Sequence, residues 1–374
     1  MSAKHPTVSA YTADAHTADT YTADAPASSG SAGFGPAGIG GIGKHRSIKA
    51  AVLAGLALAL VAATLASVMF GVRDITVADA WAALGGATDT ASQAAAYLRV
   101  PRTVLAIAVG AALALSGTTF QAITRNPLAD PGIFGVLSGA SLAVVVGIAF
   151  FSVSRPVPMM LIAITGAFAA AAFVYFIGTL GTGKATPLAL ALAGAATAAA
   201  CSSLVSAILL PRTDVMDQFR FWQIGSVGGA KWDLLGLAAP LFVLGVAIIV
   251  LSAGGLNALA LGDDTATGLG IHVTRTRLMA TCGAVILCGT ATAIAGPIGF
   301  VGLIVPHVLR LVLGTDHRVL LPATALGGAV LLVAADTLGR VVAPPTEVAV
   351  GIITPLIGAP LFIWIVRRSK VREL

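Results

Sequence analysis

The sequence LALGDDTATGLGIHVTRTR (259–277) is a polar island in a chain that is almost wholly apolar after residue 47. It gathers two aspartates, one histidine and two arginines, which a segment inside a lipid bilayer has no reason to bring together. The island is too short to form a domain, and its Ala, Gly and Leu content predicts a short amphipathic helix. We therefore predict that it lies in water between two membrane spans, where a soluble partner binds.

Composition around this island is typical of a polytopic membrane protein. Of 374 residues, 57% are hydrophobic and 10% are charged, and the mean hydropathy is +0.94; a soluble domain carries about 25% charged residues. The net charge of +6 does not indicate nucleic acid as a partner, because Lys and Arg are scattered between apolar runs. Three cysteines in apolar runs, without CxxC spacing, are expected to be small buried side chains: Cys201, Cys282 and Cys288.

The first 47 residues have a different composition. YTADA occurs at 11–15 and again at 21–25, and a stretch rich in Ser, Ala and Gly follows. Such a sequence buries too little apolar area to offset the entropy lost on ordering. We therefore predict a disordered, low-complexity cytoplasmic tail over 1–47 and one transmembrane domain over 48–374. The tail is not a signal peptide, because it lacks an apolar central region.

Ten apolar runs are long enough, or nearly so, to cross a bilayer, which takes about 20 residues. They are 48–70, 103–123, 132–152, 157–180, 187–210, 234–252, 278–295, 298–313, 319–342 and 348–366. The seventh and eighth are short and separated only by Gly296 and Pro297, so nine or eleven spans stay open. The run Phe219–Gly229 is too short to cross and is predicted to be a re-entrant or interfacial piece. The predicted fold class is all-α, a polytopic bundle of about ten transmembrane helices.

The positive residues orient these spans. With the N-terminus in the cytoplasm, fourteen Lys and Arg residues fall on the cytoplasmic side and eight fall outside. The inverted topology places most of the positive charge outside. The positive-inside rule therefore predicts that both termini and the island at 259–277 are cytoplasmic.

Few ionisable residues lie inside the spans, which disfavours an ion-coupled carrier or a channel. Carriers use carboxylates or histidines near the midplane, whereas Asp336 and Arg340 stand four apart near the outer end of one span and are expected to pair. His307 follows Pro306 and is expected to be a buried, hydrogen-bonded residue at a kink rather than a metal ligand.

The sequence has no Walker A motif, HExxH, GxSxG or paired catalytic carboxylates, so we expect neither catalysis nor ATP hydrolysis by this chain.

Six segments together resemble one family. They are LRVPRT (98–103), GAALALSGTTFQAITRNPLADPGIFGVLSGASLA (110–143), FWQIGSVGGAKW (221–232), LNALALGDDTATGLGIHVTRTR (256–277), AGPIGFVGLIVPHVLRLVLGTDHRVLLP (295–322) and EVAVGIITPLIGAPLFIWIVRR (347–368). In this order and spacing, the chain resembles the permeases of the iron-siderophore and vitamin B12 ABC importers, the type II importer family. The resemblance covers the chain apart from its N-terminal tail.

The resemblance implies a permease subunit with ten helices in the plasma membrane, in contact with lipid. It implies a second permease subunit, in a homodimer or heterodimer, and two cytoplasmic ATP-binding subunits that carry ATP and Mg²⁺, with no cofactor on this chain. An extracytoplasmic substrate-binding protein would deliver a ferric siderophore or, alternatively, cobalamin or haem. An ion-coupled secondary transporter and a membrane-embedded enzyme are the rival classes.

The resemblance also implies that the loop after the sixth span folds into coupling helices that sit in a groove of the ATPase. The residues at that position are Leu261, Gly262, Asp263, Asp264, Thr265, Ala266, Gly268, Leu269 and Gly270. Glycines permit sharp turns at the ends of a rigid lever, which would convert closure of the ATPase into movement of the spans. From the residues alone, the two acids are equally well explained as ordinary stabilisers of a helix N-terminus.

Two further residue sets follow from the resemblance. The fifth and tenth spans would line a central pathway, in which small apolar side chains let a large chelate pass without trapping it: Leu188, Ala191, Ala195, Cys201, Ile352, Pro355 and Leu356. The same residues are compatible with lipid-facing or packed positions. Cationic residues on the outer side are expected to meet acids of the binding protein, or to be interfacial anchors: Arg73, Arg99, Arg102, Arg155 and Lys231.

Overall fold

The structure, a computed structural model, describes residues 39–71, 75–180 and 186–368. The chain divides into two compact units, Met1–Lys44 and His45–Leu374, and helices α2 to α13 belong to the second. Every regular element in the described ranges is helical, with thirteen α-helices and one 3₁₀ helix, which confirms the all-α prediction. Most of the predicted tail, residues 1–38, lies outside the described residues, and α1 begins at Ile39.

Each of the ten predicted spans coincides with a helix. The elements are α1 (Ile39–Met69), α2 (Val77–Leu84), α3 (Ala91–Thr124), η1 (Pro131–Phe134), α4 (Val136–Phe151), α5 (Pro156–Thr179), α6 (Pro187–Leu209), α7 (Thr213–Gln223), α8 (Trp232–Ala260), α9 (Asp263–Gly268), α10 (Val273–Ala295), α11 (Val301–Leu313), α12 (His317–Val342) and α13 (Val350–Arg368). Seven are long and apolar enough to cross a membrane, namely α1, α3, α5, α6, α8, α10 and α12. The apolar helices α4, α11 and α13 are shorter, so the count of ten crossings stays a prediction.

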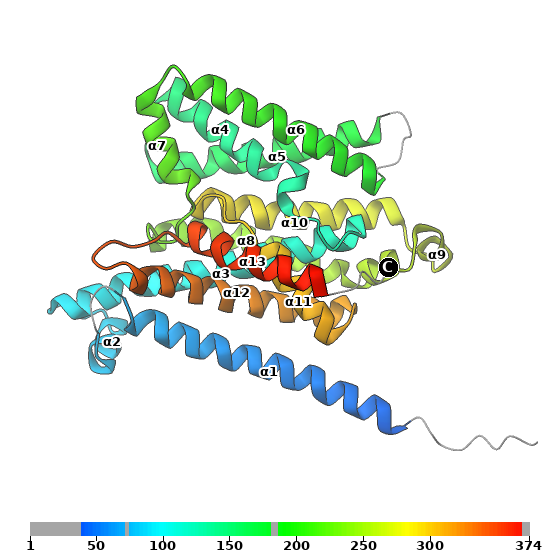
Figure 1. The fold of residues 1–374 in the computed structure, drawn as a ribbon, viewed down its shortest axis with the longest axis horizontal. Helices are drawn as coiled ribbons and strands as arrows, with labels where there is room; N and C mark the ends of the chain where they lie inside the picture. Colours follow the sequence, from blue (N-terminus) through cyan, green and yellow to red (C-terminus); the bar gives the residue numbers. More distant parts are fainter. Residues whose placement is uncertain (1–38, 72–74, 181–185, 369–374) are drawn as a thin grey trace, which may run out of the picture. The chain divides into compact units, whose positions relative to one another are not determined.

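Helices α3 and α10 form the centre of the bundle. In each of them, 78% of the most apolar 18-residue stretch is buried, against 6% in α1. Helix α3 packs along α12, α10 and α11, and α10 also packs along α8 and α5. Helices α4, α5 and α6 pack on one another, and α7 lies against α4 and α6 (Figure 1). A displacement of α3 or α10 would therefore change packing contacts with most of the other helices.

Close packing around α3 depends on paired glycines. A Cβ atom on Gly117 would overlap the backbone of Gly302 in α11, and a Cβ atom on Gly110 would overlap the carbonyl of Gly328 in α12. Without side chains at these positions, the helix backbones approach each other directly. Such close approach is the usual basis of helix association in membranes, where no hydrophobic effect draws helices together.

The segment Phe219–Gly229, predicted to be re-entrant or interfacial, has two parts. Its first residues end the amphipathic helix α7, in which Phe219 is buried and Phe221 is 81% exposed. The loop that follows is bonded to the protein, because Ser226 N donates to Ala295 O at 2.7 Å and Gly351 N donates to Gly225 O at 3.0 Å. These bonds satisfy the non-helical backbone at the point where α10 ends and α13 begins.

Candidate functional site

The island at 259–277 contains α9, a six-residue helix between the end of α8 and the start of α10 (Figure 1). Gly262 and Gly270 flank it with φ angles of 113° and 78°, which residues with side chains rarely adopt. Ala266 is fully buried and joins an apolar cluster with Leu256 of α8 and Ile123 of α3. Sharp turns at Gly262 and Gly270 and one small apolar contact at Ala266 thus position α9 against the ends of α3, α8 and α10.

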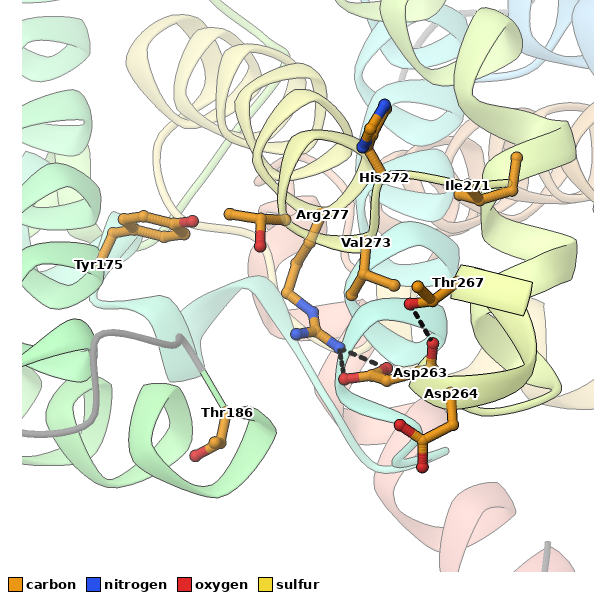
Figure 2. Close-up of a pocket in the computed structure, with 10 residues that line it drawn as sticks. Tyr175, Thr186, Asp263, Asp264, Thr267, Ile271, His272, Val273 and Arg277 are labelled. Atoms are coloured by element: carbon orange, nitrogen blue, oxygen red, sulfur yellow. Dashed lines mark hydrogen bonds and ion pairs between the residues drawn. The ribbon is translucent and has the colours of Figure 1, made fainter. Parts of the chain in front are cut away.

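Two arginines from the central helices hold Asp263, the first residue of α9. Nη2 of Arg277, in the first turns of α10, donates to Oδ1 and Oδ2 of Asp263 at 3.1 and 3.3 Å (Figure 2). Arg125, the C-cap of α3, pairs with the same carboxylate, and its Nε donates to Leu259 O at 2.9 Å. The Arg277 side chain is 7% exposed and the Asp263 side chain 44%. Because Arg277 is nearly buried, water screens its pair with Asp263 less than it screens a surface ion pair.

The outer face of α9 is exposed and partly apolar. Leu261 and Leu269 are 63% and 62% exposed at its two ends. In Figure 2 the Asp263 carboxylate is turned toward Arg277, and that of Asp264 is not. Of the nine residues predicted for the coupling segment, Ala266 faces the bundle, Gly262 and Asp263 are half-buried, and the exposed ones are Leu261, Asp264, Thr265, Gly268, Leu269 and Gly270. The two leucines therefore give this surface apolar area outside the predicted spans.

A cleft of about 360 Å³ opens beside α9. Its walls come from α5, the start of α6, α9 and the start of α10 (Figure 2), and its lining residues are Tyr175, Thr186, Asp263, Asp264, Thr267, Ile271, His272, Val273, Thr274 and Arg277. The Asp263–Arg277 pair therefore lies next to accessible space rather than inside the bundle core.

A second polar contact ties α8 to α12. Asn257 Nδ2 donates to Asp316 Oδ1 at 2.8 Å, and His317 N donates to Asn257 Oδ1 at the same distance. Burial alone raises the pKa of Asp316, but hydrogen bonds from Asn257 and the Arg318 backbone, with the charges of Lys49 and Arg318, lower that pKa overall. Asp316 is therefore ionised near neutral pH and caps the first turn of α12.

At the opposite end of the bundle, two of the predicted docking cations are committed to contacts within the chain. Arg102 pairs with Asp336 at 2.9 Å and with Glu347 at 2.6 Å, and its side chain is 12% exposed. Arg99 donates to two carbonyl oxygens at the end of α1, each at 3.0 Å. Both arginines thus join α3 to other helices or loops.

The other three docking cations differ in position. Arg155 and Lys231 are exposed, and Arg73 lies outside the described residues. Docking of a binding protein stays a prediction for all five cations. Arg155 and Lys231 are the two in the described ranges whose side chains are open to a partner.

The expected pair of Asp336 with Arg340 is confirmed, and it belongs to a larger network. Arg340 Nε lies 3.2 Å from Asp336 Oδ2, with both side chains 1% exposed. Arg340 also donates to the backbone oxygen and the hydroxyl of Ser67 at 2.8 and 2.7 Å. With Arg102, this network joins α1, α3 and α12.

Two smaller expectations are wrong. His307 packs edge-on against Phe362 of α13, with ring centroids 6.1 Å apart, and its buried Nε2 has no hydrogen-bond partner among the described residues. Cys282 is exposed on α10, whereas Cys201 and Cys288 are buried as expected. Nothing in a single apolar sequence distinguishes the faces of these helices, which is why both expectations failed.

The predicted pathway residues do not share one surface. Leu188 and Ala195 are exposed and seven residues apart, so they lie on the same face of α6. Cys201 lies on another face, beside a groove that α6 forms with α4 and α5. Ile352 and Leu356 are 48% and 67% exposed on α13, which packs on α11 and α12. The remaining residues, Ala191 and Pro355, are half-buried, and the pathway role of the whole set stays a prediction.

Sequence reasoning missed Arg102 as the partner of Asp336, and it noted Arg277 without its partner. Arg102 and Asp336 are 234 residues apart, and no local pattern joins them. Arg125 could have been predicted as a partner of an acid in the island at 259–277, because the predicted topology places both on the same side of the membrane.

The helices define a multi-pass membrane protein, and comparison with known proteins gives its family. The model of the FecCD transport family matches residues 50–368. The ferric enterobactin transport system permease protein FepD of Escherichia coli (strain K12) is 42% identical over 86% of this chain and 96% of its own. The cobalamin import system permease protein BtuC of Halobacterium salinarum is 41% identical, covering 80% of each chain.

A solved structure agrees with these relatives. It is a metal-chelate type ABC transporter in an inward-facing conformation, and it is 32% identical to this chain with a TM-score of 0.76. The match covers 86% of this chain and 99% of that one. The chain therefore belongs to the FecCD transport family.

Proposed function

We propose that this chain is the transmembrane permease subunit of an ATP-driven importer that moves a ferric siderophore into the cytoplasm. The observation that carries the proposal is the nearly full-length similarity to the ferric enterobactin permease, which covers 96% of that protein. The match to the cobalamin permease covers less of both chains. Cobalamin and haem are the alternative substrates.

The proposal assigns ATP hydrolysis to separate subunits. The sequence has no Walker A motif to bind the phosphates of ATP. Two cytoplasmic ATP-binding subunits would carry ATP and Mg²⁺, and this chain would bind no cofactor. The exposed leucines that flank α9, Leu261 and Leu269, support this division, because a coupling surface must offer apolar area to a soluble partner.

The remaining partners follow from the same proposal. A second permease subunit, identical or related, would complete the pathway within the plasma membrane. An extracytoplasmic binding protein would deliver the chelate to the end of the bundle that carries α2 and α7. Both termini would be cytoplasmic, on the side of α9, as the distribution of Lys and Arg indicates.

Uptake in cells that lack the gene tests the substrate. Complementation with this chain is expected to restore uptake of radiolabelled iron supplied as a ferric siderophore, and excess cobalamin or haem should not compete. Restored uptake of labelled cobalamin or haem, with no effect on the iron chelate, would overturn the siderophore assignment and leave the importer class intact.

A further inference from the structure

The coupling segment is tied to the two most buried helices by one carboxylate. Asp263 accepts from Arg277 of α10, and it pairs with Arg125 at the end of α3. These two helices are buried over 78% of their most apolar stretches, more than any other candidate span. Asp263 is therefore the charged contact that joins α9 to both of these helices.

The other contacts of α9 are weaker for this purpose. Ala266 offers a single methyl group to its apolar cluster, and dispersion contacts of one methyl group are small. The flanking residues Gly262 and Gly270 allow turns but offer no side chain with which to transmit force. Hydrogen bonds between charged groups are directional and stronger than neutral ones.

We propose that Asp263, Arg277 and Arg125 form a clamp that positions α9 and transmits its movement to α3 and α10. The proposal rests on the proposed function, because the movement it transmits is that of an ATPase docked on α9. The three residues are positioning residues: the clamp acts through α9, and the exposed Leu261 and Leu269 provide the docking surface.

Asp264 offers a comparison within the same helix. It is exposed and also lies in the first turn of α9, so Asp264→Asn removes the same charge from nearly the same place. Both variants weaken any attraction between this surface and a cationic partner, and both remove one favourable charge at a helix N-terminus. Only Asp263→Asn removes the carboxylate that the two arginines share.

The first measurement requires no partner. A nitroxide label on Thr265→Cys, in a background that lacks Cys201, Cys282 and Cys288, reports the mobility of α9 in the purified protein. We expect Asp263→Asn to give a narrower, more mobile spectrum, and Asp264→Asn to leave the spectrum as it is. Equal spectra for the two variants would overturn the clamp.

The second measurement uses the complete transporter in proteoliposomes. We expect Asp263→Asn to retain its ATPase subunits on co-purification and to hydrolyse ATP. It should import several-fold less substrate per ATP than Asp264→Asn, because movement of α9 no longer reaches α3 and α10 through the shared carboxylate. Equal import per ATP would overturn the clamp as a transmitting element, and loss of the ATPase subunits would identify Asp263 as a direct contact instead. If the wild-type complex imports nothing, the proposed function fails, while the spectra still decide whether the clamp exists.

Discussion

Asp336 is the residue on which the polar network at the α2 end of the bundle depends. Its side chain is 1% exposed, accepts a hydrogen bond from Arg102 at 2.9 Å and forms an ion pair with Arg340 at 3.2 Å. Charges buried in this way are tolerated only when opposite charges and hydrogen bonds satisfy them. Asp336 therefore makes it possible for α3 and α12 to carry buried arginines in an apolar bundle.

Replacement of Asp336 by Asn should destabilise the protein strongly. The buried Arg340 guanidinium would keep its positive charge without a carboxylate, and Arg102 would keep only Glu347. Breaking a buried pair in this way costs about 3–5 kcal/mol. Thermal or chemical unfolding of the purified protein in detergent measures the loss. Asp89→Asn, which removes an exposed carboxylate, serves as control and should change stability by about 0.5 kcal/mol or less. Equal stability of the two variants would show that the network is not structural.

At the level of the helix, the contact between α3 and α11 depends on two missing side chains. Gly117 faces the backbone of Gly302, so even a methyl group at position 117 forces the helices apart. Gly236 in α8 has nothing within 4 Å of the position that its Cβ would take. The two glycines have the same helical backbone but opposite surroundings.

The variant Gly117→Ala should therefore lower the unfolding free energy by about 1–3 kcal/mol, the usual cost of overpacking. The matched variant Gly236→Ala should leave stability unchanged or raise it slightly, because Ala favours the helix over Gly by about 1 kcal/mol. Melting temperatures of the two proteins in the same detergent make the comparison. If Gly117→Ala is as stable as Gly236→Ala, the backbone contact is not tight in solution.

The helices were predictable because a bilayer leaves an apolar chain few choices. Inside hydrocarbon every backbone group must bond within the chain, so each apolar run becomes a helix. The faces of those helices were not predictable: Cys201 and Leu188 lie on different sides of α6, although both sit in an apolar run. Ion pairs such as Arg102 with Asp336 join residues 234 apart and leave no local pattern. The position of α9 was predictable because acids and glycines interrupted the apolar sequence there.

For the whole molecule, the N-terminal tail is expected to be dispensable. The family model matches only from residue 50, and the composition of residues 1–38 offers little apolar area for packing. Deletion of residues 2–38 should leave membrane insertion and uptake near wild type, as measured by the amount of protein in the membrane and by the initial uptake rate. Loss of either would show that the tail contributes to folding or transport.

As proposed above, this FecCD-family chain imports its substrate with energy from ATP hydrolysed by partner subunits. The most direct test uses proteoliposomes that contain the permease with its ATP-binding subunits, supplied with a ferric siderophore on its binding protein. We predict that uptake requires ATP on the side of the ATP-binding subunits and stops with a non-hydrolysable analogue, whether or not an ion gradient is present. Uptake driven by a proton or sodium gradient without ATP would show that the chain is an ion-coupled transporter instead.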